Sequence, residues 1–302
     1  CMSLLLIDSA SLWYRAYYGM PDTLLSPKGE PINAIKGFID MSARLINHYK
    51  PQQVVLCLDG DWRPSWRVEL FPGYKLHRID AEGEEEEPDL LTPQIPYILD
   101  FFDALGFPVI GVDDAESDDV IATIASRTKG SVRIATGDRD LFQLVDDDKD
   151  IKVVYLAKGI SAHDLVDRSW IEKKYGIPGD RYSLFAMIRG DASDGLPGIK
   201  GIGEKGAAAI AMQFASMNEV IEATQSGDQR LKDAHRKKIS ADIDYARIVQ
   251  RLVSCTADLR LPNFPEKHPS SPANIKEVNR IREELGLGSS VDRLFAALSW
   301  QK

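Results

Sequence analysis

Cysteine pairs, long apolar runs and an excess of positive charge are all missing from this sequence. Its three cysteines, Cys1, Cys57 and Cys255, lie far apart and form no Cys-x-x-Cys spacing. That arrangement argues against a zinc site and a disulfide framework, and it fits a chain that stays reduced in the cytoplasm. Cys1 precedes Met2, so we expect Met2 to be the natural start.

A membrane segment is also missing. No apolar run approaches the ~20 residues that cross a bilayer, and no signal peptide is visible. The 302 residues and their ordinary composition allow one large domain or two smaller ones. We therefore expect a globular cytoplasmic protein with no membrane partner.

The charge balance is acidic, with a formal net charge of −9. Proteins that bind nucleic acid usually carry a basic balance, so this value argues against such a partner. The objection weakens if many carboxylates gather around metal ions, because bound cations invert the local field. The positions of the carboxylates along the sequence therefore decide whether the negative net charge argues against nucleic-acid binding.

Two short apolar runs each end in an aspartate. Residues 4–7 lead to Asp8, and residues 54–58 lead to Asp59. Runs of this kind are typical of strands buried on both faces of a parallel sheet, and ligands bind at the carboxyl ends of such strands. A helix cap explains one such aspartate equally well, but the repetition favours a site.

Two acidic clusters follow in the middle of the chain. Residues 113–119 contain Glu116, Asp118 and Asp119, and residues 136–140 contain Asp138 and Asp140. Like charges this close repel strongly at low dielectric, so a fold that joined the clusters would need cations between them. A hard divalent metal is the simplest candidate. Helix dipoles and turns explain either cluster alone, and residues 113 and 114 are expected to be turn residues.

Basic and aromatic residues alternate between positions 60 and 92. Arg63 and Arg67 are spaced i, i+4, and Lys75 and Arg78 are spaced i, i+3, so each pair is expected to share a helix face. Such a surface suits contact with phosphates, with rings free to stack on bases. A surface helix with snorkelling arginines is the alternative. The acidic run at residues 82–87 is expected to be a solvated, mobile connection.

The rest of the chain predicts the fold class. Strand and helix patterns alternate to about residue 156, and after Gly159 the chain is expected to turn helical. Residues 257–275 are proline-rich and expected to be extended, with one or two last helices after them. The prediction is an α/β fold with a mainly parallel central sheet flanked by helices, followed by a helical region.

A glycine-rich turn lies inside that helical region, between two predicted helices. It contains Gly198, Lys200, Gly201, Gly203 and Lys205. Glycines at this spacing let a loop approach a partner closely, with free N–H groups at the start of the next helix. We expect this hairpin to hold a backbone phosphate without reading base sequence.

Taken together, the motifs resemble the 5′ nuclease family, which includes bacterial flap endonucleases and the 5′→3′ exonuclease domain of DNA polymerase I. The resemblance covers nearly the whole chain and keeps the motif order. It is carried by residues 5–8 and 14–16, then 71–78, 116–120, 136–140 and 190–198. Departures are small: Ser9, Ser117 and Gly206 stand where the family more often has Gly, Ala and Thr. No polymerase domain follows, so a stand-alone form is expected.

The resemblance implies a PIN-like nuclease core at residues 2–160, with a helical arch inserted at about 60–92. A DNA-binding helix-hairpin-helix (H3TH) region and a tail would occupy residues 161–302. It also implies nine metal ligands. Four would hold a first ion: Asp8, Asp59, Glu116 and Asp118. Five would surround a second: Asp119, Asp138, Asp140, Asp191 and Asp194.

The implied activity is hydrolysis of DNA phosphodiester bonds by two metal ions, as a 5′→3′ exonuclease and 5′-flap endonuclease in replication and repair. Mg²⁺ is the expected ion, with Mn²⁺ able to substitute and K⁺ at the hairpin. Lys75, Arg78, Asp8 and Asp138 would act in catalysis, and Tyr74 would stack on a base. The expected DNA contacts are Arg15, Arg63, Arg67, Tyr74, Lys75, Arg78, Gly198, Lys200, Gly201, Gly203 and Lys205. A monomer acting on nicked or branched duplexes, including RNA-primer hybrids, is implied.

Two alternatives remain open at this point. A related metal-dependent nuclease acting on RNA would share the acidic sheet edge, but it would not need the hairpin at residues 190–207. A non-catalytic DNA-structure binder would have lost some carboxylates or Lys75, and all are present.

Overall fold

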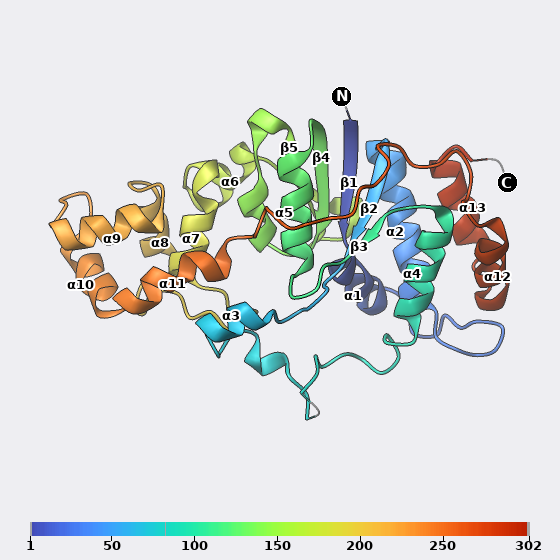
Figure 1. Ribbon diagram of the computed structural model, residues 1–302, viewed down its shortest axis with the longest axis horizontal. Helices are drawn as coiled ribbons and strands as arrows, with labels where there is room; N and C mark the ends of the chain where they lie inside the picture. Colours follow the sequence, from blue (N-terminus) through green and yellow to red (C-terminus); the bar gives the residue numbers. More distant parts are fainter. Residues whose placement is uncertain (1, 82, 301–302) are drawn as a thin grey trace.

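A six-stranded sheet forms the centre of the protein, in a computed structural model that describes residues 2–81 and 83–300 (Figure 1). Its spatial order is β3-β2-β1-β4-β5-β6. All neighbours pair in parallel except β5 and β6, which are antiparallel. The strands are β1 (Met2–Asp8), β2 (Gln53–Cys57), β3 (Val109–Ile110), β4 (Gly130–Thr136), β5 (Ile151–Tyr155) and β6 (Asp164–Val166).

Alternate residues of the strands enter two separate apolar cores, one on each face of the sheet. Leu5 and Ile7 of β1 pack with α1 (Ser9–Gly19), α2 (Asn33–Tyr49) and α4 (Gln94–Leu105). Leu4 and Leu6 pack on the opposite face with α5 (Ser117–Arg127), α6 (Arg168–Tyr175) and α7 (Tyr182–Arg189). Burial of both faces explains why these strands are continuously apolar rather than alternating.

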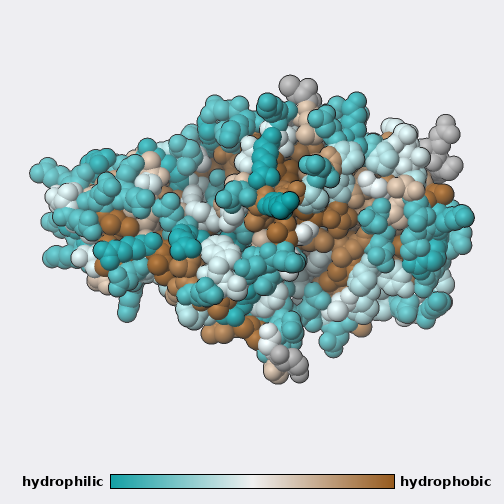
Figure 2. Space-filling model, in the orientation of Figure 1, coloured by the Kyte–Doolittle hydropathy of each residue, from teal (hydrophilic) through white to brown (hydrophobic). Residues whose placement is uncertain are grey.

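The C-terminal part begins with a row of helices and ends back on the sheet domain. After α7 come α8 (Glu204–Ala211), α9 (Met217–Ser226), α10 (Asp233–Ala241) and α11 (Ile243–Val253), which form the narrow end of the molecule in Figure 1. This end is largely hydrophilic on the face drawn in Figure 2. An extended segment then crosses α5, and α12 (Ile275–Leu285) and α13 (Gly288–Ala297) pack beside α4 and α2.

The predicted fold class is confirmed, with one local correction. The expectation that the chain is helical throughout after Gly159 is wrong for Asp164–Val166, which forms β6. Strand β6 is short and lies at the sheet edge, so its sequence carries little of the apolar signal that marks the buried strands. No described helix is long and apolar enough to cross a membrane.

The segment at residues 60–92, where a helical arch was predicted, contains little helix in its described residues. They contain one six-residue helix, α3 (Ser65–Leu70), and a 3₁₀ turn at Leu76–Arg78. Arg63 precedes Pro64, the residue before α3, so the prediction that Arg63 and Arg67 share a helix face is wrong. Lys75 lies just outside the 3₁₀ turn with φ +50°, so its pairing with Arg78 is not on an α-helix either. Proline and the left-handed residue interrupt both helical spacings.

Glu85 and Glu86 of the acidic run pair with the residues that precede the run. Ile79 and Glu85 form an antiparallel bridge, and the Glu86 amide donates to the Arg78 carbonyl. Glu85 lines the main pocket, while Glu84 and Glu86 are exposed. Glu82 lies outside the described residues.

Candidate active site

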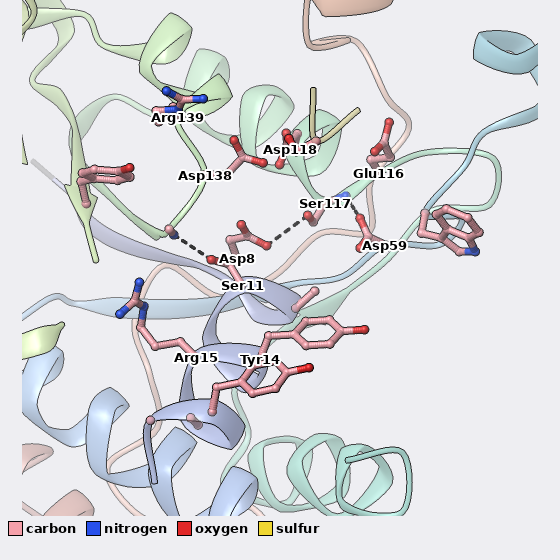
Figure 3. A pocket seen from close by; sticks show the side chains of 18 of the residues that line it. Asp8, Ser11, Tyr14, Arg15, Asp59, Glu116, Ser117, Asp118, Asp138 and Arg139 are labelled. Carbon is pink, nitrogen blue, oxygen red and sulfur yellow. Dashed lines mark hydrogen bonds between the residues drawn. The ribbon is translucent and has the colours of Figure 1, made fainter. Parts of the chain in front are cut away.

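A large pocket lies at the carboxyl edge of the parallel strands. It has a volume of about 870 Å³ and is bounded by α1, the segment from residue 59 to 85, the start of α5 and the loops after β4 and α7. Figure 3 shows its acidic side chains converging from separate elements above Tyr14 and Arg15 of α1. Eight carboxylates line it: Asp8, Asp59, Glu85, Glu116, Asp118, Asp138, Asp191 and Asp194.

Hydroxyl side chains fix the carboxylates at the strand ends. Asp8 accepts hydrogen bonds from Thr136 Oγ1 at 2.7 Å and from Ser117 Oγ at 3.3 Å. The Ser117 amide also donates to Asp59 at 2.7 Å, and the Asp138 amide donates to Thr136 Oγ1 at 2.9 Å. Ser117 therefore links the carboxylates of Asp8 and Asp59, and Thr136 links the Asp8 carboxylate to the backbone of Asp138. The sequence assigned Ser117 and Thr136 no role, although both stand inside the acidic motifs.

Low solvent access disfavours the charged form of the carboxylates at the strand ends. Burial raises the pKa of Asp8 to about 7, against the hydrogen bond from Thr136, and the charges of Asp59 and Asp138 add to the rise. Burial also raises the pKa of Asp118 well above its usual value, reinforced by Asp138 and Asp8. Carboxylates that repel one another in an enclosed space bind protons or cations tightly. The site is therefore built to take up positive charge.

The carboxylates predicted around the second ion differ in their hydrogen bonding and in the direction of their pKa shifts. Burial would raise the pKa of Asp191, but hydrogen bonds from Ser193 lower it below its usual value. Burial raises the pKa of Asp194 to about 6, against the charge of Lys75. Asp140 does not line the pocket, but the charges of Asp138, Asp191 and Asp194 act on it, and its buried Oδ1 has no hydrogen-bond partner among the described residues. An unpartnered carboxylate oxygen beside this cluster is suited to bind a cation or an ordered water.

The Glu116 carboxylate is contacted by three side chains of the segment between β2 and α4: Lys75, Arg67 and Tyr74. Lys75 Nζ and Arg67 Nη1 each form an ion pair with Glu116, and the Tyr74 hydroxyl donates to it at 2.8 Å. Arg67 and Tyr74 are buried, so neither presents its side chain to solvent as the predicted DNA contacts would require. Arg63 is also engaged, with Nε donating to the Tyr74 carbonyl at 2.6 Å.

Arg78 and Arg15 lie at the rim of the same pocket. Arg78 Nη2 is 3.1 Å from Asp194 Oδ1, and Lys75 Nζ is 3.9 Å from the same oxygen. Lys75 and Arg78 therefore converge on one site, as predicted, although not through a shared α-helix. Arg15 comes from α1 on the opposite wall, close to Tyr155.

Asp119, like Asp140, is a predicted ligand that does not line the pocket. It is almost fully buried, and its carboxylate accepts hydrogen bonds from Arg67 and from the Thr256 amide. Asp114, expected to be a turn residue, has φ +54° and accepts from the amide and hydroxyl of Ser65 at the start of α3.

The connection from α7 to α8 begins with pocket residues Asp191 and Asp194 and continues into the glycine-rich hairpin, where none of residues 198–205 lines the pocket. Gly198 and Gly201 have φ +67° and +80°, and Gly203 stands just before α8. Lys200 and Lys205 are exposed on it. The loop is braced from the turn between α10 and α11, because the Lys200 amide donates to Asp242 at 3.0 Å and Lys238 Nζ donates to the Gly201 carbonyl at 2.7 Å.

The oxygen-only donor set fits a hard divalent metal ion. In the residues that the structure describes, no three acidic, histidine or cysteine side chains already form a metal-ligand group. The reason is visible at Glu116 and Asp194, where lysine and arginine take the place of a cation. Ion binding would need these side chains to exchange partners. An acidic pocket at a parallel sheet edge, with basic residues at its rim, defines a site for metal-assisted chemistry on a phosphate-containing substrate.

Comparison with known proteins identifies the protein family to which this site belongs. A family model described as the 5′-3′ exonuclease N-terminal resolvase-like domain matches residues 3–176, and one described as the 5′-3′ exonuclease C-terminal SAM fold matches residues 177–276. The chain therefore belongs to the 5′-3′ exonuclease family. It is an enzyme of the nuclease class, so the non-catalytic alternative is excluded.

Relatives of similar length share this assignment. A 5′-3′ exonuclease of Streptomyces coelicolor is 42% identical over 98% of this chain and 100% of its own length. One of Mycobacterium tuberculosis is 37% identical over 98% of this chain and 97% of its own length. A DNA polymerase I of Caldicellulosiruptor bescii is 31% identical over 97% of this chain but only 33% of its own length. This chain is similar to that polymerase over about one third of the polymerase's length.

Solved structures confirm the fold. A bacteriophage T5 flap endonuclease, solved as a pseudo-enzyme-product complex with DNA and metal ions, superposes with a TM-score of 0.65 at 16% identity, covering 98% of this chain and 99% of that one. A T5 5′-exonuclease with bound divalent zinc ions gives a TM-score of 0.63 at 17% identity, covering 98% and 97%.

Proposed function

We propose that this protein is a structure-specific 5′ nuclease that hydrolyses DNA phosphodiester bonds at nicks and 5′ flaps. One observation carries the proposal: eight carboxylates line a single pocket together with Lys75 and Arg78. The acidic groups are suited to hold divalent ions, and the two cations are suited to bind the phosphate between those ions.

The proposed ion is Mg²⁺, with Mn²⁺ able to replace it. Asp8, Asp59, Glu116 and Asp118 would hold one ion, and Asp138, Asp140, Asp191 and Asp194 would surround the other. Bound there, the ions would lower the pKa of a water molecule and stabilise the attacking and leaving oxygens. The oxygen-only donors and the raised pKa values of Asp8 and Asp118 support this assignment.

The protein's own residues orient this chemistry. Ser117 and Thr136 hold Asp8 and Asp59 at the strand ends, so the first carboxylates are positioned before an ion arrives. Lys75 and Arg78 would move from Glu116 and Asp194 to the scissile phosphate once ions take those carboxylates. For Tyr74 to stack on a base, as proposed from the resemblance, the segment around residues 60–92 would have to move.

The hairpin supplies the proposed grip on the duplex. Its exposed Lys200 and Lys205 and the N-terminus of α8 would contact a backbone phosphate, with Gly198, Gly201 and Gly203 allowing close approach. The Lys238 ammonium at the Gly201 carbonyl supports a monovalent cation such as K⁺ near this loop. Arg15 would contact the strand on the far wall of the pocket.

The proposal also covers the substrate class, the cellular location, the oligomeric state and the division of the chain into two regions. The substrate class includes RNA primers hybridised to DNA, and the protein would act as a cytoplasmic monomer in replication and repair. The division into a core at residues 2–160 and a DNA-binding region at residues 161–302 belongs to the proposal.

The proposal is tested by incubating the protein with a 5′-flap duplex and a nicked duplex, with Mg²⁺ or with chelator. We expect short 5′ products from both substrates with Mg²⁺ and none with chelator. A folded protein that releases no product from either substrate would refute the proposal.

A further inference from the structure

Arg67 is a buried arginine that faces two carboxylates at once. Only 3% of it is exposed, and it comes from α3, between the strand end at Asp59 and Lys75. Its Nη1 and Nη2 donate to the two oxygens of Asp119 at 3.2 and 3.1 Å. Nη1 also forms an ion pair with Glu116. One planar guanidinium therefore bridges a pocket-lining carboxylate and one that is outside the pocket.

Asp119 has no capacity left for a metal ion. Besides the two bonds from Arg67, its Oδ1 accepts from the Thr256 amide at 2.7 Å and its Oδ2 accepts from the Glu116 amide at 3.3 Å. A carboxylate offers about four acceptor positions, and four donors are present here. The residue is 1% exposed and absent from the pocket lining.

Two aromatic rings shield the contact between Arg67 and the two carboxylates from water. The Trp66 ring lies 4.5 Å from the guanidinium carbon, and the Tyr74 ring lies 5.8 Å from it. Charge pairs shielded from water in this way hold their geometry more firmly than surface pairs. The start of α3 is fixed in turn by Ser65, which donates to Asp114.

We propose that Asp119 is not a metal ligand and that Arg67 and Asp119 together position the metal ligand Glu116. Asp119, held by the Thr256 amide and the first turn of α5, anchors the guanidinium, and the guanidinium fixes the Glu116 carboxylate toward the pocket. The pair also ties α3 and the extended segment after α11 to the metal site. This inference rests on the proposed function, because Glu116 is taken to bind metal.

The test counts Mn²⁺ ions bound to the DNA-free protein, by electron paramagnetic resonance and titration calorimetry. Asp119→Asn should bind as many ions as the unmodified protein, whereas the matched control Asp118→Asn, one residue away and lining the pocket, should bind one fewer. Loss of an ion in Asp119→Asn would show that Asp119 is a ligand and would overturn the proposal.

Arg67→Lys tests the positioning role separately, because lysine keeps the charge but cannot bridge two carboxylates. We expect Mn²⁺ affinity to fall roughly 10–100-fold, the usual effect of losing a partner that orients a ligand, with the number of ions unchanged. Combining Arg67→Lys with Asp119→Asn should weaken binding little further, because both changes break one unit.

A purely structural role for Arg67 would lower the unfolding temperature and leave Mn²⁺ affinity unchanged, and that result would contradict the proposal. Because these measurements need no DNA, they are independent of whether the unmodified protein cleaves a flap.

Discussion

The ammonium of Lys75 pairs with the carboxylate of Glu116 inside the pocket. A residue expected to bind the substrate phosphate therefore lies on a residue expected to bind metal. In the absence of ions and DNA, each group neutralises the other, which explains how so many acidic side chains coexist in one pocket. Metal and substrate binding would separate the pair, so the two events are expected to be coupled.

Lys75→Ala should tighten metal binding while slowing cleavage. The ion no longer has to displace an ammonium from Glu116, and a charge-assisted hydrogen bond of this kind is worth about 1–3 kcal/mol. Mn²⁺ affinity measured by calorimetry should therefore rise roughly fivefold or more. Lys28→Ala, on the exposed loop before α2, serves as control and should change neither quantity. Weaker Mn²⁺ binding in Lys75→Ala would show that the ammonium does not compete with the ion.

The metal-free protein should lose stability as the pH rises from about 4 to 7. The folded pKa of Asp8 is about 7, above its unfolded value of 3.8, so the folded state binds the proton more tightly across this window. The free energy of unfolding then falls with rising pH. Urea unfolding in chelator at pH 5 and pH 8 measures this, and Asp8→Asn should show a smaller difference.

Added Mg²⁺ should reverse that trend, because the ion replaces the lost protons at pH 8. If the metal-free protein were instead more stable at pH 8 than at pH 5, the pocket carboxylates would not carry the raised pKa values described.

Lys200→Ala should weaken duplex binding and make it less dependent on salt. Each phosphate contact contributes about 0.9 to the slope of log affinity against log salt, so the slope should fall by roughly 1. Filter binding in chelator between 50 and 200 mM salt, a range in which phosphate contacts show clearly, measures this slope. Lys276→Ala on α12, at the opposite end of the molecule, is the control. An unchanged affinity combined with lost turnover would assign Lys200 to catalysis instead.

Gly198→Ala should destabilise the hairpin by at least about 1 kcal/mol, the cost of a left-handed backbone for a residue with a Cβ. The φ of Gly198 is +67°, and an added Cβ would lie 2.6 Å from the Arg189 backbone. Gly203→Ala is the matched control, because a Cβ there meets nothing within 4 Å and the φ is ordinary. Equal losses of stability in urea unfolding at both positions would contradict this distinction.

The acidic half of the site was predictable because strand ends fix it. Asp8 and Asp59 follow apolar runs, and parallel strands bring their carboxyl ends to one edge. The acidic motifs before α5 and after β4 follow the same rule. Thus the sequence predicted seven of the eight carboxylates that line the pocket, and it missed Glu85, which was expected to lie in a solvated connection.

The basic half could not be predicted from spacing. The sequence places Arg67 in a short helix, but only the packing of α3 against α5 and α11 decides that its guanidinium faces inward. The same holds for Tyr74, whose ring is buried against Glu116 rather than free for a base. Asp119 is a carboxylate, as a metal ligand would be, but its contacts are those of a structural residue. It follows Asp118 by one position in α5, and one position along a helix changes the side that a residue faces.

The most direct test of the metal-dependent nuclease site compares the unmodified protein with Asp138→Asn on a 5′-flap duplex. Asp138 lines the pocket, whereas Lys200 and Lys205 of the hairpin expected to grip the duplex do not. With Mg²⁺, Asp138→Asn should release no product while the unmodified protein cleaves the flap, and both should bind the duplex with similar affinity in Ca²⁺. Cleavage by Asp138→Asn at the normal rate would contradict the assignment of this pocket as the active site.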